Sequence, residues 1–244
     1  MSASMMQLNR PEAYETTTEL ELMERLLPLG NRRILELGCG GAWTTRQLAE
    51  RHPGSRFVAT EVDQRQHAKN LILQLPNLEF RLEGAEAISE PADSIDIVWM
   101  LKSLHHVPAP KMPKVMEEIH RVLKPGGLAW FSEPVYAGPF NALMSLIHDE
   151  KLVREQAFEA IRSEVVSGAM LLKEERFFQV PGVFESWEQF ESRFLQVTHT
   201  ELAIGDRRYA EIRAAFMAHM QEDGAHFLKL HRLDLLQKPP ISMG

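Results

Sequence analysis

The run Arg33-Ile34-Leu35-Glu36-Leu37 is short and rich in Ile and Leu, and it stops abruptly at Gly38-Cys39-Gly40-Gly41. A helical pattern follows, with Leu48 and Ala49 on its apolar side. Short apolar runs bounded by turn residues are typical of buried strands. Glycines directly after such a strand allow a tight bend that a nucleotide cofactor can approach closely. The segment therefore predicts a strand, turn and helix unit that holds a cofactor at its bend.

The alternation of strand and helix patterns continues along the first half of the chain. Further strands are predicted at residues 56–62, 78–82, 94–100 and 128–132. One of the intervening helices is capped by Asp63, and its predicted apolar side consists of Ala68, Leu71, Ile72 and Leu75. Strands that alternate with helices are joined by right-handed crossovers into a mostly parallel sheet.

The regular alternation of strand and helix patterns ends after the fifth strand. Residues 134–200 carry helical patterns and many aromatic residues, and we expect a helical lid insertion here that covers the substrate. A strand near residues 197–200, a helix led by Asp206 and a last strand near residues 227–236 would complete the sheet. The predicted fold is α/β, a doubly wound, Rossmann-like and mostly parallel seven-stranded sheet whose last strand is antiparallel. We expect residues 1–244 to form a single domain.

Charge and composition narrow the classes of partner. The net charge is −7, and no run of basic residues offers the phosphate contacts on which nucleic-acid binding depends. No stretch approaches the roughly 18 apolar residues of a membrane span, and the first residues lack a signal-peptide pattern. The single cysteine, Cys39, excludes an internal disulfide. We expect a cytoplasmic protein that binds neither nucleic acid nor membrane, and the sequence does not indicate its oligomeric state.

The spacing of the glycines argues against a dinucleotide cofactor. The fingerprint G-x-G-x-x-G, started at Gly38, would require a glycine where this chain has Trp43. An indole at that position would obstruct the close approach of a pyrophosphate. NAD and FAD are therefore disfavoured.

The segment from Ile34 to Ala42 resembles the first motif of the class I S-adenosylmethionine-dependent methyltransferases, in their type 11-like, small-molecule branch. Three further segments resemble that family in the expected order, at residues 58–62, at 95–98 with 104–107, and at 118–127. The resemblance spans about residues 33–134. It implies that S-adenosyl-L-methionine is the cofactor.

The resemblance assigns roles at two strand ends and at the bend. Glu36 would face the cationic amino group of the cofactor's methionine part, and Gly38 and Gly40 would let the backbone pass close to the sulfonium. Glu61 lies 23 residues after Gly38 and would accept hydrogen bonds from both ribose hydroxyls. Val62 would lie against the adenine face.

Two positions depart from the family pattern. The family's third glycine is Ala42 here, a small change that the bend should tolerate. The aspartate that often follows the third strand and binds the adenine amino group is replaced by Gly84. The adenine contacts would then come from the Ala85 backbone N–H and from Glu86, and the expected cofactor contacts in this part of the site also include Gly84 and Leu101.

Three more residues complete the candidate cofactor site. Cys39 is expected to be a small packing residue whose backbone contacts the cofactor, and nothing indicates a thiolate nucleophile. Trp43 either covers the methionine part or packs in the first turn of its helix. Tyr14 either reaches the cofactor carboxylate or lies at the surface as a capping residue.

His105 and His106 are the candidates for acid and base catalysis, because an unperturbed imidazole titrates near neutral pH. They follow the fourth strand, where this fold opens its active site. The alternative is a purely positional role. A metal site that adds His120 is not expected, because no carboxylate joins these histidines at ligand spacing.

The function predicted from these residues is methyl transfer from S-adenosylmethionine to a small-molecule acceptor by in-line displacement. The sulfonium is already a good leaving group, so the protein mainly aligns the reactants and excludes water. The acceptor atom, whether O, N, S or C, stays open. Two alternatives also stay open, a non-methylating enzyme on the same cofactor and a catalytically inactive ligand-binding module of the same fold.

Overall fold

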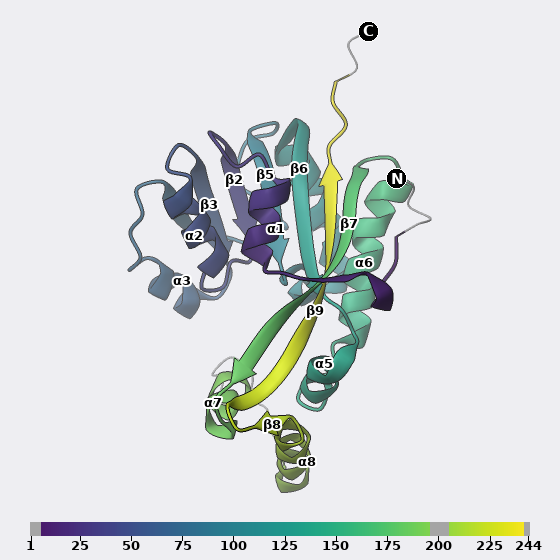
Figure 1. Cartoon of the computed structure of the whole chain (residues 1–244). Coiled ribbons are helices and arrows are strands. Elements are labelled where there is room, and N and C mark those ends of the chain that lie inside the picture. The colour runs from purple at the N-terminus through teal and green to yellow at the C-terminus, as the bar shows by residue number, and fades with distance from the viewer. Residues whose placement is uncertain (1–5, 196–204, 242–244) are drawn as a thin grey trace.

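A computed structural model describes residues 6–195 and 205–241 of the chain. Within them, one mixed sheet of nine strands runs through the molecule (Figure 1). Its parallel part has the order β4 (Leu78–Leu82), β3 (Arg56–Glu61), β2 (Arg33–Leu37), β5 (Ile95–Leu101) and β6 (Leu123–Pro134). The strand order reverses at β2, which lies between β3 and β5. Doubly wound sheets bind ligands at such a point, beyond the carboxyl ends of the strands.

The sheet continues past β6 through β9 (Gly224–Gln237), β7 (Leu171–Phe184) and β1 (Tyr14–Thr16). The strand β9 is antiparallel to both β6 and β7, and the two-residue β8 (Met220–Gln221) pairs with it. Figure 1 shows β7 and β9 leaving the sheet as a long two-stranded arm. The predicted α/β class and antiparallel last strand are confirmed. The sheet has nine strands where the sequence predicts seven: six predicted strands are present, β1, β7 and β8 were not predicted, and the strand predicted near residues 197–200 lies outside the described residues.

Helices cover both faces of the parallel sheet. Ile34 and Phe57 share a core with α1 (Glu19–Leu26) and α2 (Trp43–Arg51), whereas Leu35 and Val58 share one with α4 (Met112–Val122) and α6 (Lys151–Val166). Successive strand residues point to opposite faces, so these strands are buried on both sides and read as apolar runs. The other helices are η2 (Pro11–Ala13), α3 (Gln64–Asn70), η3 (Leu104–His106), η4 (Ala109–Lys111), α5 (Gly138–Ser145), α7 (Trp187–Phe194) and α8 (Asp206–Met217). No helix in the described ranges is long and apolar enough to cross a membrane.

The helix α3 is shorter than predicted. Asp63 caps its first turn as expected, but α3 ends at Asn70 and does not reach Leu75. Leu71 and Ile72 lie beyond the helix end and are 55% and 79% exposed. These two side chains bury little apolar surface, and short helices depend on such packing for their stability.

The strand β7 lies inside the segment predicted as a helical lid. That segment does contain α5, α6 and α7, and the strand predicted near residues 197–200 lies outside the described residues. Most of the aromatic residues of the region pack into a separate core at the end of the arm, built from Leu143, Phe184, Trp187, Phe190, Ile212, Phe216, Ala225 and Phe227. The charged run Lys173–Arg176 obscures the alternation typical of a strand. These charges are tolerated because β7 pairs with β9 along one side and with only three residues of β1 along the other.

Candidate active site

A cavity of about 580 Å³ opens at the carboxyl ends of β2, β3 and β5. This volume lies within the roughly 300–1,000 Å³ that is usual for small-molecule sites. The structure brings together in its wall the predicted residues Gly38, Cys39, Gly40, Glu61, Val62, Ala85, Glu86, Leu101 and His106. The predicted residues outside this wall are Tyr14, Glu36, Trp43, Gly84 and His105.

The glycine bend after β2 requires residues without a side chain. Gly38 and Gly40 have φ angles of +70° and +51°, in the left-handed region that favours glycine. A Cβ atom added to Gly38 would lie 2.9 Å from the Cβ of Ser103, which follows β5. The Ser103 hydroxyl donates a hydrogen bond to the Leu37 carbonyl oxygen at 2.8 Å. The ends of β2 and β5 are thus held together, and the bend that follows β2 lines the cavity.

Glu61 ends β3 and holds this bend. One carboxylate oxygen accepts a hydrogen bond from the Gly40 backbone N–H at 2.8 Å, and the other accepts from the N–H groups of Val62 and Asp63 at 2.8 and 2.9 Å. Opposite the carboxylate, the Asn70 side chain donates to the Gly40 carbonyl oxygen at 2.7 Å. An ionised carboxylate has about four acceptor positions, so Glu61 retains acceptor capacity toward the cavity.

Glu36 lies behind the bend and is 3% exposed. Its carboxyl group accepts a hydrogen bond from the Thr45 hydroxyl at 2.5 Å, and the Trp99 indole N–H donates to the same hydroxyl at 3.2 Å. Removal from water raises the pKa of Glu36 to about 8, against the smaller opposing effects of Thr45 and Lys102. With this pKa the acid holds its proton near neutral pH.

Replacing Glu36 by glutamine is expected to change how stability depends on pH. The folded state keeps a proton that the unfolded state loses above its ordinary pKa of about 4.5, so unfolding of the wild type becomes easier as the pH rises toward about 8. In the wild type the free energy of unfolding falls by at most about 1.4 kcal/mol for each pH unit from this cause, and in Glu36→Gln this fall is absent. Denaturant unfolding at pH 6 and pH 8 measures it, with the exposed Glu50→Gln on α2 as the control. Parallel profiles for wild type and Glu36→Gln would contradict the buried, protonated state.

The other predicted residues outside the wall have local roles. The Tyr14 hydroxyl donates to the Asn9 side chain at 2.7 Å, and burial raises the pKa of Tyr14 to about 12. Trp43 begins α2 and is 75% exposed. Gly84 lies beside the Glu86 carboxylate, which a Cβ atom at this position would meet. Contacts of Tyr14, Trp43 and Gly84 with a cofactor stay predictions.

His105 and His106 follow β5 in η3, with their ring centroids 4.0 Å apart. His105 is buried, and its Nδ1 is hydrogen-bonded to the Glu133 carboxylate, while its Nε2 lies 3.8 Å from the carboxylate of Glu150. Burial alone lowers the pKa of His105, but these two carboxylates outweigh it and the pKa is raised. Desolvation and the neighbouring His105 lower the pKa of His106, which lines the cavity. Adjacent groups with pKa values pushed apart are typical of acid and base pairs.

One premise of the metal prediction is wrong, because a carboxylate does join the two histidines. Ligand atoms of His105, His106 and Glu150 lie within 4.8 Å of one another. However, the Glu150 oxygen that faces His105 also pairs with the Arg154 guanidinium at 2.6 Å. The carboxylate is thus already neutralised, and a bound dication would have to displace a cation.

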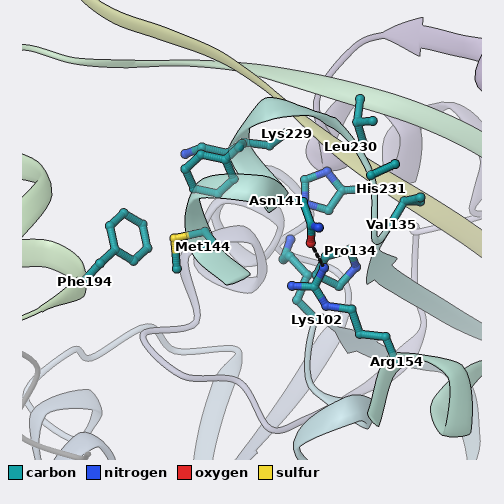
Figure 2. Close-up of a pocket in the computed structure, with 12 residues that line it drawn as sticks. Lys102, Pro134, Val135, Asn141, Met144, Arg154, Phe194, Lys229, Leu230 and His231 are labelled. Atoms are coloured by element: carbon teal, nitrogen blue, oxygen red, sulfur yellow. Dashed lines mark hydrogen bonds between the residues drawn. The ribbon is translucent and has the colours of Figure 1, made fainter. Parts of the chain in front are cut away.

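A second cavity was not predicted. It has a volume of about 230 Å³, lies between α5, α6 and the start of the β7–β9 arm, and shares Lys102 with the first cavity. Figure 2 shows Lys102, Arg154, Lys229 and His231 around it, with Phe194 beyond Met144 at one end. Glu133, which holds His105 and was not predicted, did have a signal in the sequence, because this acid lies at or near the end of an apolar strand as Glu36 and Glu61 do.

Comparisons with known proteins agree with this arrangement. Residues 34–127 match the family described as a methyltransferase domain. The ubiquinone biosynthesis O-methyltransferase of Pseudomonas entomophila is 28% identical over 136 residues, which cover 54% of this chain and 56% of that protein. The chain therefore spans about half the length of the curated relatives that it matches.

Solved structures extend the likeness of fold to most of the chain. The YcgJ protein of Bacillus subtilis is similar with a TM-score of 0.63 at 17% identity, covering 90% of this chain and 97% of that one. The cyclase SpnF is similar with a TM-score of 0.58 at 20% identity, covering 93% and 86%. At such identities the likeness shows the fold. Together with the match of residues 34–127 to a methyltransferase domain, it shows that the chain has the methyltransferase fold, with the glycine bend at the switch point of its sheet.

Proposed function

We propose that this protein transfers a methyl group from S-adenosyl-L-methionine to a small-molecule acceptor. The observation that carries the proposal is the composition of the larger cavity, whose wall joins the glycine bend, the Glu61 carboxylate and His106 at the carboxyl ends of the parallel strands. The matched relative named as a ubiquinone biosynthesis O-methyltransferase supports an acceptor of this size class. The net charge of −7 argues against a nucleic-acid acceptor.

The residues of the larger cavity fit the proposed cofactor. The backbone at Gly38 and Gly40 is free of side chains where the methionine part and the sulfonium would lie, and Glu61 has acceptor capacity for the ribose hydroxyls. Apolar contacts for adenine would come from Val62 and Leu101. The further adenine contacts assigned to Ala85 and Glu86 belong to the same wall, where Glu86 pairs with Lys111 at 2.6 Å.

The chain's own residues would perform the remaining tasks. Bound S-adenosylmethionine supplies an activated methyl group on a sulfonium. His106 has a lowered pKa and faces the cavity, so it is neutral near pH 7 and can accept the proton of a hydroxyl acceptor. His105, held by Glu133, is the positioning residue beside it. The body of the acceptor would occupy the smaller cavity, and its reacting atom would extend past Lys102 into the larger cavity, whose wall includes His106. Residues 134–200 would cover the acceptor within the single domain 1–244.

A different reaction in the same fold is the second candidate, because a solved structure of this fold is that of a [4+2]-cyclase. The mass of the product distinguishes the two, since methyl transfer adds 14 mass units. A ligand-binding module without activity is distinguished by binding of S-adenosylmethionine without turnover.

The proposal is tested with S-adenosylmethionine that carries a labelled methyl group. The purified protein is incubated with a fractionated small-molecule extract and, in parallel, with tRNA and DNA. We expect label in small molecules and release of S-adenosylhomocysteine. Label in tRNA or DNA instead, or no turnover with any fraction, would contradict the proposed function.

A further inference from the structure

The smaller cavity is rich in positive charge. Lys102, Arg154 and Lys229 reach it from the end of β5, from α6 and from β9, and Figure 2 shows their side chains around the same space. The rest of the wall is mainly apolar and includes Phe140, Met144 and Phe194. The distribution of counter-ions among the three cations therefore bears on what the cavity binds.

Two of these cations are already paired. The Lys102 ammonium lies 3.1 Å from the buried carboxylate of Glu19. The Arg154 guanidinium lies 2.6 Å from Glu150 and donates to the Asn141 side-chain oxygen at 2.7 Å, a bond that Figure 2 shows as a dashed line. Neither group needs a ligand to balance its charge.

Lys229 differs from both. In the part of the chain that the structure describes, no carboxylate lies within ion-pair distance of its ammonium and no hydrogen-bond acceptor is present. The ammonium lies 5.0 Å from the ring centroids of both Phe140 and Phe184. Gly182 on the adjacent strand leaves room for it, since a Cβ atom there would lie 3.0 Å from the ammonium nitrogen.

The surroundings of Lys229 make an uncompensated charge costly. Desolvation, with Arg193 and Lys102 nearby, lowers the pKa of Lys229. His231, which also lines the cavity, offers no negative charge, and burial and Lys102 lower its pKa to about 4, so it is neutral. The rings of Phe140 and Phe184 attract the ammonium but carry no net charge. Buried cations are normally paired with a group of opposite charge, which offsets more of the cost of desolvation.

We propose that the smaller cavity binds a small acceptor with an apolar, flat body and a single carboxylate, and that Lys229 is the counter-ion of that carboxylate. This inference rests on the proposed function, because it takes the cavity next to the cofactor as the acceptor site. One unpaired cation matches a monoanion, and the aromatic and thioether side chains match a flat apolar body. The volume of about 230 Å³ is below the usual range for ligand sites and limits the acceptor to a small molecule.

The test compares naphthalene-2-carboxylate with naphthalene-2-carboxamide, which differ in charge but hardly in shape. Their dissociation constants are measured by titration calorimetry on the full chain, with and without saturating S-adenosylhomocysteine. We expect the wild type to bind the carboxylate at least tenfold more tightly than the amide. The ratio should fall to about one in Lys229→Met and should largely remain in Lys229→Arg. The exposed Lys173→Met on β7 is the matched control and should keep the wild-type ratio.

Three results would overturn the inference: equal affinities in the wild type, no binding of either probe, or an unchanged ratio in Lys229→Met. Thermal unfolding checks that each variant is folded, and Lys229→Gln replaces Lys229→Met if the latter is not. The proposed function is tested separately, by the binding of S-adenosylhomocysteine. If the wild type binds S-adenosylhomocysteine but does not prefer the carboxylate probe over the amide, only the proposed acceptor class is contradicted. If the wild type prefers the carboxylate but does not bind S-adenosylhomocysteine, only the proposed function is contradicted.

Discussion

Replacing Glu61 by glutamine is expected to weaken the binding of S-adenosylhomocysteine by about 100-fold. The variant would lose the charge-assisted hydrogen bonds to the two ribose hydroxyls, worth about 1.5 kcal/mol each. The carboxylate is the only acidic group that accepts from the Gly40 backbone N–H within the described residues. A glutamine would retain the size of the side chain. It would also turn an N–H₂ group toward the backbone N–H groups of Gly40, Val62 or Asp63. The bend would then lose hydrogen bonds that hold it, and the ribose would lose an acceptor.

Calorimetric titration of S-adenosylhomocysteine measures this effect. Glu79→Gln is the control, because Glu79 lies on the neighbouring strand β4 and pairs with Arg81 outside the cavity. The unfolding temperature of both variants shows whether the bend remains folded. An affinity of Glu61→Gln within a few-fold of wild type would remove Glu61 from the cofactor site.

Replacing His106 by alanine is expected to lower kcat for a hydroxyl acceptor by about 10²- to 10⁴-fold, the usual contribution of a general base. The affinity for S-adenosylhomocysteine should change little, because the imidazole is assigned to the acceptor and not to the cofactor. In the wild type, kcat should fall as the pH falls through the lowered pKa of His106, since protonation removes the base. The variant should lose this dependence.

The control for this prediction is His120→Ala, since His120 lies on α4 away from the cavity. A thiolate or tertiary-amine acceptor needs no base, so the loss should shrink with such acceptors. If His106→Ala keeps the wild-type kcat and pH profile with a hydroxyl acceptor, the histidine pair has a positional role only.

The parallel half of the sheet could be predicted from the sequence because its signals are local. Strands buried on both faces are short apolar runs, and glycine, proline and aspartate mark their ends. The bounds of β2, β3, β4 and β5 agree with prediction within one residue or so. The glycine bend and Glu61 follow from the same pattern, because they occupy fixed places after β2 and at the end of β3.

Apart from the last strand, β9, the rest of the sheet could not be predicted in the same way. The charges between Lys173 and Arg176 are tolerated in β7 because this strand lies near the sheet edge, and they conceal its alternation. The short β1 and β8 depend on partners far away in the sequence.

The smaller cavity has the same limitation. Arg154 and Lys229 belong to α6 and β9, and only the topology brings them to Lys102. Glu150 likewise reaches His105 across a separation that no local spacing reveals. Sequence reasoning predicted much of the wall of the larger cavity because those residues are tied to strand ends, whereas the smaller cavity is assembled from elements whose contacts are non-local.

A crystal structure of the protein with S-adenosylhomocysteine tests the central claim most directly. The account predicts the methionine part of the ligand along the Gly38–Gly40 bend and both ribose hydroxyls within hydrogen-bond distance of the Glu61 carboxylate. Binding at any other place, or no bound ligand at saturating concentration, would contradict it.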